Sequence, residues 1–140
     1  MMTESGIEIT NDKSLVNVEY VHQYLSKTSY WAKGRSKEDV IQSIENSICF
    51  SVLDSNKNQI GFARVVTDTV VFAWIMDVFV DKRYQGLGIG KLLIKNMLSH
   101  PSLAEVNGIG LKTFDAHGLY KKYGFNIVED PEIWMFKKIK

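Results

Sequence analysis

The sequence predicts an α/β domain in which helices cover a mixed sheet, and three observations support this fold class. Short apolar segments typical of strands alternate along the chain with segments whose apolar residues recur at helical spacing. One run, residues 70–80, is apolar almost throughout, as expected of a strand buried on both faces. A glycine-rich segment then leads directly into another helix. With 140 residues, 45% of them hydrophobic, the chain is expected to form a single domain over residues 1–140.

The first part of the chain is expected to contain a strand followed by two helices. Residues 7–10 alternate between apolar and polar and are typical of a short strand. A helix is predicted next because the following side chains share one face at helical spacing: Leu15, Val18, Val21, His22 and Leu25. After a loop over residues 26–34, Ser36 precedes Asp39 by three residues, as at the start of a capped second helix. Its expected inward-facing residues are Val40, Ile41 and Ile44.

Strands dominate the middle of the chain. Residues 48–54 and 59–67 flank a polar turn and are expected to pair as antiparallel strands. The buried strand over residues 70–80 follows. After the glycine-rich segment, a helix is predicted that ends before Pro101. Its inward-facing residues are expected to be Leu92, Leu93, Met97 and Leu98.

The last part of the chain is expected to add a strand, a short helix and two more strands. Residues 108–113 are predicted to form the first of these strands. Asp115 is placed to cap a short helix that runs to Tyr123, with Gly124 at its C-terminal end. Two terminal strands are predicted over residues 125–128 and 134–137.

Charge and cysteine content argue against several classes of protein. The net charge of +1 gives no indication of a nucleic-acid or anionic-membrane partner. Neither a secretory signal nor a stretch of about 20 apolar residues is evident. The single cysteine, Cys49, lies in an apolar run and is typical of a buried residue in a reducing compartment. We therefore expect a soluble cytoplasmic protein. No metal site is expected, because His22 and His100 lack partners at ligand spacing.

The glycine-rich turn is the most informative segment. Gly86, Gly88 and Gly90 alternate between the buried strand and the next helix. Glycine permits a positive φ and the close approach of a ligand, and the free amides of a helix N-terminus attract anions. Positive charge is supplied nearby by Lys82, Arg83 and Lys91. These features together predict a site for phosphate or pyrophosphate.

Two common phosphate-binding motifs do not fit this turn. The P-loop pattern requires glycine where Gln85 stands and Ser or Thr where Leu92 stands, and the dinucleotide pattern requires glycine at Lys91. Instead, Gln85-x-x-Gly88-x-Gly90 resembles the Arg/Gln-x-x-Gly-x-Gly/Ala motif of the GNAT superfamily of N-acetyltransferases.

The resemblance implies a GNAT-like fold and acetyl-CoA as co-substrate. The fold would contain a mixed, mostly antiparallel sheet of about six to seven strands, with a splay between strands 4 and 5, and about four helices. Amides of the turn would bind the pyrophosphate, and the pantetheine arm would lie in the splay. The residues implied in cofactor binding are Val78, Phe79, Val80, Gln85, Gly86, Leu87, Gly88, Ile89, Gly90 and Lys91.

A second part of the resemblance lies downstream, in residues 111–125. The family has a strand there, then a short helix with a Leu-Tyr pair, and then a Phe/Tyr-Gly-Phe sequence; this chain has Leu119-Tyr120 and Tyr123-Gly124-Phe125. The resemblance implies that Asp115, Leu119 and Tyr123 lie at the cofactor. Tyr123 is expected to pack rather than to catalyse.

Tyr120 is the predicted general acid. A thiolate leaves when an amine attacks a thioester, and a phenol held beside it can donate to the developing charge. A strand amide near Phe79 is the candidate donor to the negative oxygen. The base that takes the proton from the amine is left open between Asp77, on the buried strand, and a water chain to solvent.

The acceptor side is less well defined by the sequence. The resemblance implies that the loop between the first two helices contributes to the acceptor pocket. Tyr30 and Trp31 are candidate walls, Arg35 a candidate anion partner and His117 a candidate substrate contact. An acidic run, Glu129-Asp130-Pro131-Glu132, could attract an amine. The expected acceptor is therefore an amine of a small molecule or peptide.

Two other functions stay open at this stage. One is a module that binds coenzyme A without turnover, and the other is an acyltransferase that uses another acyl group or a hydroxyl acceptor. The resemblance also allows a homodimer, since a terminal strand can pair between subunits.

Overall fold

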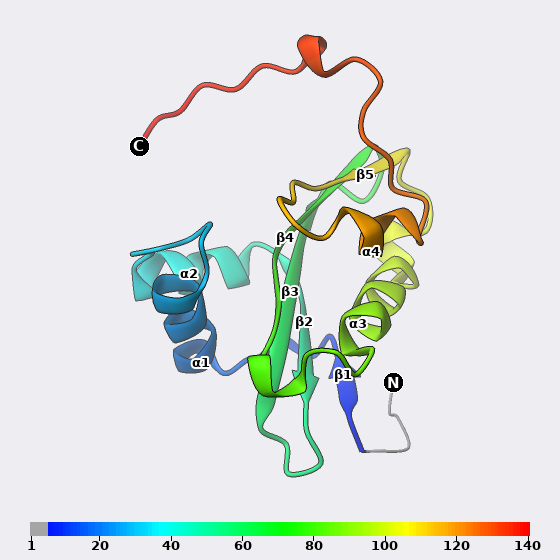
Figure 1. Ribbon diagram of the computed structural model, residues 1–140. Helices are drawn as coiled ribbons and strands as arrows, with labels where there is room; N and C mark the ends of the chain where they lie inside the picture. Colours follow the sequence, from blue (N-terminus) through cyan, green and yellow to red (C-terminus); the bar gives the residue numbers. More distant parts are fainter. Residues whose placement is uncertain (1–5) are drawn as a thin grey trace.

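A five-stranded sheet forms the centre of the protein. Figure 1 shows the computed structural model, of which residues 6–140 are described. The strands follow one another in the order β1 (Glu8–Thr10), β2 (Ile48–Leu53), β3 (Gln59–Thr67), β4 (Phe72–Val80) and β5 (Gly108–Gly110). Neighbouring strands are antiparallel except β4 and β5, which run parallel. The predicted mixed, mostly antiparallel sheet is confirmed, with fewer strands than the expected six to seven.

Helices cover both faces of this sheet (Figure 1). On one side lie α1 (Val18–Gln23), its π-helical continuation η2 (Tyr24–Thr28) and α2 (Lys37–Glu45). On the other side lie α3 (Ile89–Leu98) and α4 (His117–Lys121). Four single turns of 3-10 helix connect the larger elements: η1 (Lys13–Leu15), η3 (Lys82–Tyr84), η4 (Pro101–Leu103) and η5 (Pro131–Ile133). None of the helices within residues 6–140 combines the length and apolar composition that spanning a membrane requires.

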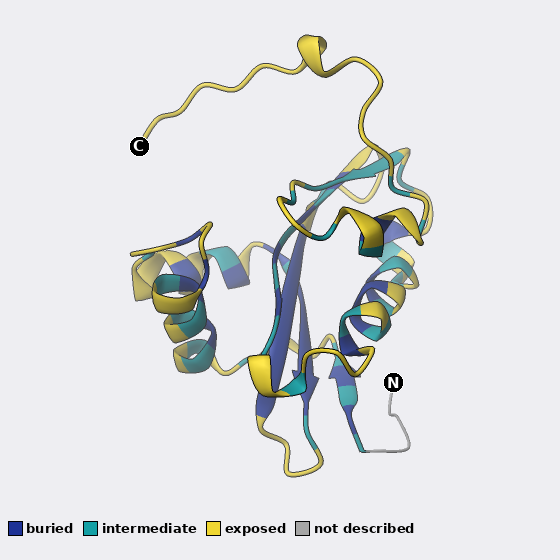
Figure 2. Ribbon diagram, in the orientation of Figure 1, coloured by how far each residue is buried: buried dark blue, intermediate teal, exposed yellow. Residues whose placement is uncertain are grey.

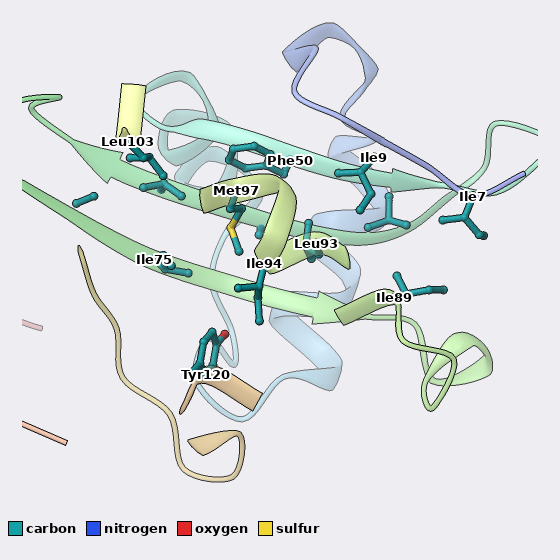
Figure 3. Packing of buried hydrophobic residues seen from close by; sticks show 14 of the residues in the cluster. Ile7, Ile9, Phe50, Ile75, Ile89, Leu93, Ile94, Met97, Leu103 and Tyr120 are labelled. Atoms are coloured by element: carbon teal, nitrogen blue, oxygen red, sulfur yellow. The ribbon is translucent and has the colours of Figure 1, made fainter. Parts of the chain in front are cut away.

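The core is divided by the sheet into two clusters. The larger one joins the sheet to α3 and α4, and Figure 3 shows Leu93, Ile94 and Met97 of α3 directed into it. Each of these side chains is fully buried, which contributes about 1.5–3 kcal/mol apiece to folding before entropic costs. The smaller cluster joins the sheet to α1 and α2 through residues such as Val21 and Val40. The sheet is thus buried on both faces, as expected for the apolar run in β4.

The local signals of the N-terminal half are mostly confirmed. Ser36 caps α2, its Oγ accepting a hydrogen bond from the Asp39 amide at 3.1 Å. Leu15 and Ile41 were expected to face inward, but they are 47% and 38% exposed. Leu15 lies in η1 rather than in α1, so the helical spacing that placed it on the buried face does not apply there.

A bulge interrupts β4 at Asp77. Phe62 pairs with Phe79 but Arg64 pairs with Met76, so one β3 residue faces two residues of β4. Asp77 has a φ of 54°, in the left-handed region that non-glycine residues rarely occupy. The extra residue reverses the alternation of side chains. Odd-numbered residues before the bulge face α3, whereas Phe79 after it packs towards α1.

The parallel strands β4 and β5 stay together over a short distance only. Phe72–Trp74 pair with Gly108–Gly110, and residues 75–80 of β4 have no β5 partner in the described structure. A Cβ added at Gly110 would lie 2.7 Å from the Trp74 ring, so this position needs glycine. The predicted splay is confirmed, and it leaves one main-chain edge of β4 without a strand partner.

The C-terminal part differs most from the prediction. The strand expected over residues 108–113 ends at Gly110, because β4 diverges from it there. Ala116, not Asp115, is the N-cap of α4, and the cap makes no side-chain hydrogen bond; Thr113 Oγ1 accepts from the Ala116 amide instead. The strands predicted over residues 125–128 and 134–137 are absent in the described chain. A strand requires a neighbour, and residues 126–140 instead form an exposed arm (Figure 2).

Candidate active site

The glycine turn forms an open cradle at the N-terminus of α3. Gly86 and Gly88 both have a φ of 80°, and a Cβ built on either would meet no atom within 4 Å. Gly88 is the N-cap and provides no side-chain hydrogen bond. The first amides of α3 therefore have no helical or capping acceptor among the described residues. Left-handed glycines, free amides and open space are what a bound anion requires.

Gln85 ties this turn to the end of β4. Its side-chain amide donates to the Val80 carbonyl at 3.0 Å, which places the turn against the last residue of the strand. Leu87, between Gly86 and Gly88, is 70% exposed, whereas Ile89, the first residue of α3, is buried in the core, so the turn is anchored at the start of the helix and open before it. The glycine cradle consequently lies next to the end of β4 at which the strand is splayed from β5.

Positive charge gathers beside the cradle. Lys91 lies in the first turn of α3, and it lowers the pKa of the neighbouring Lys122, first through a side-chain hydrogen bond and then through charge repulsion. Tyr123 fixes this arrangement, because its hydroxyl donates to the Lys91 carbonyl at 3.1 Å. Sequence analysis missed Lys122, since only the docking of α4 against α3 brings the two lysines together. An anion bound here would relieve their repulsion.

Asp77 is the centre of a buried polar network. Its carboxylate accepts from Arg64 Nε at 2.6 Å, from Arg35 Nη1 at 2.7 Å and from the Trp31 indole at 2.8 Å. Arg64 also donates to Ser47 Oγ at 3.1 Å. Burial alone would raise the pKa of Asp77, but the Arg64 and Arg35 guanidinium groups outweigh it and lower the pKa below its usual value. Sequence analysis gave no indication of Arg64.

The network explains how a non-glycine residue can occupy the bulge. The left-handed backbone at Asp77 costs about 1–2 kcal/mol, and three hydrogen bonds, two of them from charged donors, offset this cost. The same network holds the loop before α2, through Trp31 and Arg35, against the middle of β4.

Only the main chain of Phe79 lies at the splay between β4 and β5, because its side chain packs on the α1 side of the sheet. Its ring stacks on Tyr24 with centroids 3.8 Å apart and an interplanar angle of 5°. Tyr20 lies against the same ring at 5.9 Å. Val78 and Val80 point to the opposite cluster. The strand is therefore held by its side chains while its free edge faces the gap beside β5.

Tyr120 lies on α4 in the cluster that contains Ile75 of β4 and Ile94 of α3 (Figure 3). It is 7% exposed, and its ring packs edge-on against Phe125 at 5.7 Å. Burial, aided by Tyr30 and Asp115, raises the pKa of Tyr120 to about 12. The phenol thus stays protonated throughout the neutral range.

Three aromatic rings contact one another on the surface, and one of them, Tyr30, lies close enough to Tyr120 to raise its pKa. Tyr30 contacts Trp31 edge-on at 5.0 Å and Phe114 at 5.5 Å, which joins the loop before α2 to the loop after β5. Phe114 is 85% exposed and was not anticipated from the sequence. His117, the first residue of α4, is exposed. Two residues implied at the cofactor lie nearby: Asp115 just before α4 and Leu119 within it. Leu119 Cδ2 would lie 3.8 Å from a Cβ built on Gly90.

A shallow polar cleft of about 400 Å³ lies on the other side of the Asp77 network. Arg35 and Arg64 line it together with polar residues of α2. Arg35 and Arg64 share the Asp77 carboxylate, and Asp39 and Lys140 also line the cleft, so the charges around it are mixed.

Within residues 6–140, no group of three or more His, Cys, Asp or Glu side chains is placed to hold a metal ion. Cys49 is buried, and burial raises the pKa of its thiol to about 11. It is therefore a core residue and not a nucleophile at neutral pH.

The splayed parallel strand pair and the open glycine cradle fit the GNAT-like fold that the sequence resemblance implies, and comparison with known proteins agrees. Residues 45–127 match the acetyltransferase (GNAT) domain, and the chain belongs to this family. It is 31% identical to the uncharacterized N-acetyltransferase ycf52 of Pyropia yezoensis, over 89% of this chain and 80% of that protein. The corresponding protein of Porphyra purpurea is 30% identical, over 86% and 79% of the two chains.

A solved structure resembles the whole chain. The crystal structure of a protein assigned to the GNAT family, from Xanthomonas campestris pv. campestris, superposes with a TM-score of 0.92 and 34% identity. The match covers 99% of this chain and 96% of that one.

Proposed function

We propose that this protein transfers the acetyl group of acetyl-CoA to an amine of a small molecule or peptide. The observation that carries the proposal is the position of the glycine cradle at the end of the unpaired edge of β4. A ligand with an anionic pyrophosphate followed by an amide-bearing arm matches this surface. The cradle supplies amides for the phosphates, and the strand edge supplies main-chain groups for the amides.

Each segment of the surface has a proposed role in binding. The left-handed Gly86 and Gly88 would let the pyrophosphate approach the first amides of α3, and Lys91 and Lys122 would add attraction. Val78, Phe79 and Val80 would present their main chain to the pantetheine arm. When bound, acetyl-CoA supplies an activated acyl group as a thioester.

We assign Tyr120 as the proton donor to the leaving sulfur. With its pKa raised to about 12, the phenol keeps its proton and can donate a hydrogen bond to a thiolate. Complete transfer to a thiolate whose own pKa is about 8.5 would be uphill, so hydrogen-bond stabilisation would provide most of the effect.

Asp77 has a different proposed role from the base that the sequence suggested. A carboxylate with a lowered pKa and three hydrogen-bond donors is a weak base. We propose that it positions the bulge and the loop before α2, and that the amine loses its proton to water. The assignment as general base stays a prediction that this geometry disfavours.

The acceptor would enter beside Tyr30, Trp31 and Phe114. These rings contact one another across two loops, with Tyr30 next to Tyr120, and would form an apolar wall. The Arg35 side chain forms an ion pair with Asp77 but is 21% exposed to solvent, so it can also contact an anionic group of the acceptor. His117 stays a candidate contact at the start of α4.

A steady-state assay tests the proposal. A panel of amines is incubated with acetyl-CoA, and acetyl transfer is measured as the amount of free coenzyme A thiol released. Tyr120→Phe should lower turnover by roughly 10²-fold or more. Tyr24→Phe is the control, because it removes a phenol hydroxyl on the opposite face of the sheet and keeps the ring that stacks on Phe79. Binding of acetyl-CoA with no thiol release for any amine would support a binding module without turnover, and faster reaction with succinyl-CoA or a hydroxyl acceptor would support the other acyltransferase function.

A further inference from the structure

The polar cleft beside the Asp77 network is separate from the cofactor surface. Its walls come mainly from the loop before α2, from α2 and from β3, and none of the residues proposed to hold acetyl-CoA lines it. The helices α2 and α3 cover opposite faces of the sheet, so the cleft and the glycine cradle also lie on opposite faces (Figure 1). The charged residues of the cleft are Arg35, Asp39, Arg64 and Lys140.

Arg64 is buried but incompletely paired. Its side chain is 8% exposed, its Nε donates to Asp77, and its Nη1 donates to Ser47 Oγ. A guanidinium group carries five N–H donors, so three of them have no acceptor within residues 6–140. His22 Nδ1 is the one fully buried side-chain nitrogen or oxygen of the described chain that lacks a hydrogen-bond partner. The unpaired Nη2 of Arg64 is therefore not sealed in the core and is reached from the cleft that this side chain lines.

Arg35 adds further unpaired donors. Its Nη1 donates to Asp77 Oδ2, which also accepts from Arg64, whereas its Nε and Nη2 have no acceptor in the described part of the chain. Arginine stays protonated in proteins, and the lowered pKa of Asp77 keeps that carboxylate ionised at neutral pH. Two cations thus share one anion, and the largely buried group carries one unit of positive charge in excess.

The other two charges of the cleft do not balance this excess. Asp39 and Lys140 have opposite signs and are both exposed, so solvent and salt screen them. Among the described residues, Asp39 forms no ion pair with either arginine. The guanidinium donors consequently lack both an acceptor and a neutralising charge, and buried donors of this kind are normally paired.

We propose that this cleft binds a small oxyanion, a carboxylate or phosphate group, through the guanidinium groups of Arg35 and Arg64. Two N–H groups of a guanidinium match two oxygens of such a group, and the hydrogen bonds are strengthened by charge. The anion would supply the acceptors that Arg64 lacks and neutralise the excess charge. The neutral side chains of Gln42, Ser43 and Asn46 would contact the polar remainder of the ligand.

The arginine Nε–Hε signals in a ¹⁵N correlation spectrum test the site directly. The chain has three arginines, so Arg35→Lys and Arg83→Lys assign two signals and leave the third to Arg64. Titration of the unaltered protein with inorganic phosphate, and separately with malonate, is carried out at constant ionic strength. The signals of Arg35 and Arg64 should shift and saturate together.

Arg83 is the internal control. It pairs with Asp81 just before the glycine turn, so it reports on an anion bound at the cradle instead of the cleft. A shift of the Arg83 signal alone would overturn the proposal. So would equal shifts of all three signals that do not saturate.

Two substitutions in α2 change the charge of the cleft and leave the Asp77 network intact. Gln42→Glu adds a negative charge and should weaken phosphate binding by about two- to five-fold at low salt; Asp39→Asn removes one and should strengthen it by a similar factor. Both side chains are exposed, so the fold should persist. Asn56→Asp is the matched control, because it adds a charge in the exposed β2–β3 turn, outside the cleft. Equal phosphate affinity in Gln42→Glu and Asn56→Asp would overturn the proposal.

Kinetics distinguish two sources of the oxyanion, and this arm alone rests on the proposed acetyl transfer. If the acceptor carries the acid group, ω-amino acids of a suitable length should have a lower KM than their carboxamides, and Gln42→Glu should reduce the difference. If a separate anion binds, phosphate should change kcat for an uncharged amine, and less so in Gln42→Glu. In an active enzyme, saturation of the arginine signals with neither effect would mark phosphate as an adventitious ion only and overturn the site. The titration requires no turnover, so failure of this site and failure of the acetyl transfer are distinguishable.

Discussion

Replacing Asp77 by asparagine tests the buried network at the centre of the site. Asparagine has nearly the same shape and tolerates the left-handed backbone, so the bulge itself should persist. The charge is lost, however, and Arg64, whose side chain is 8% exposed, remains buried without its anion. Breaking a buried ion pair by removing one partner costs about 3–5 kcal/mol. For a chain of 140 residues this corresponds to a fall in Tm of roughly 10–17 °C.

Differential scanning calorimetry measures this change, and Glu19→Gln provides the control. Glu19 pairs with Lys37 on the surface, where both side chains are at least half exposed, so its removal should have little effect on Tm. The folded-state pKa of Asp77 is lowered, so its stabilising contribution is present above the unfolded value of about 3.9 and is lost as the pH falls through the folded value. The difference between Asp77→Asn and the unaltered protein should therefore shrink below about pH 4. A decrease of less than about 3 °C at pH 7 would refute the reasoning.

The remaining predictions concern the cofactor surface and the proton donor. Lys122→Gln should weaken acetyl-CoA binding several-fold at low salt and less at high salt, measured by calorimetry, because the lysine acts through charge. Gly110→Ala should lower the free energy of unfolding by about 1–3 kcal/mol in urea titrations, since the added Cβ meets the Trp74 ring. Because the pKa of Tyr120 is raised to about 12, kcat should not fall between pH 8 and 10 from loss of its proton; a fall in that range that Tyr120→Phe removes would contradict the assignment.

The elements that sequence could predict are those fixed by neighbouring residues. The β2–β3 hairpin, the Ser36 cap and the strand–glycine–helix order all depend on contacts within a few positions of the chain. The glycine cradle was predictable for the same reason, because the left-handed glycines and the helix start lie in one short segment.

The parts that sequence could not predict depend on distant contacts. Asp77 is hydrogen-bonded to Trp31, Arg35 and Arg64, which are 46, 42 and 13 residues away in the sequence. No local sequence pattern predicts such a network. Phe114 likewise becomes part of a site only through its contact with Tyr30.

The terminal strands show a different limit of sequence reasoning. The apolar pattern of residues 134–137 predicted a strand, and this prediction is wrong because a strand forms only where a neighbour supplies its hydrogen bonds. In the isolated chain that neighbour is missing from the described residues, and the segment remains an exposed arm.

Binding of acetyl-CoA to Gly88→Ala and Gly124→Ala, compared by calorimetry with the unaltered protein, tests the central claim most directly. Both glycines are left-handed, with φ of 80° and 89°, and neither has an atom within 4 Å of an added Cβ. The two variants thus carry the same backbone strain, about 1–2 kcal/mol, but only Gly88→Ala places a methyl group in the proposed pyrophosphate cradle. We predict that Gly124→Ala binds acetyl-CoA as the unaltered protein does and that Gly88→Ala loses most of its affinity. Equal affinity in both variants, or no binding by the unaltered protein, would contradict the assignment of this turn as the cofactor site.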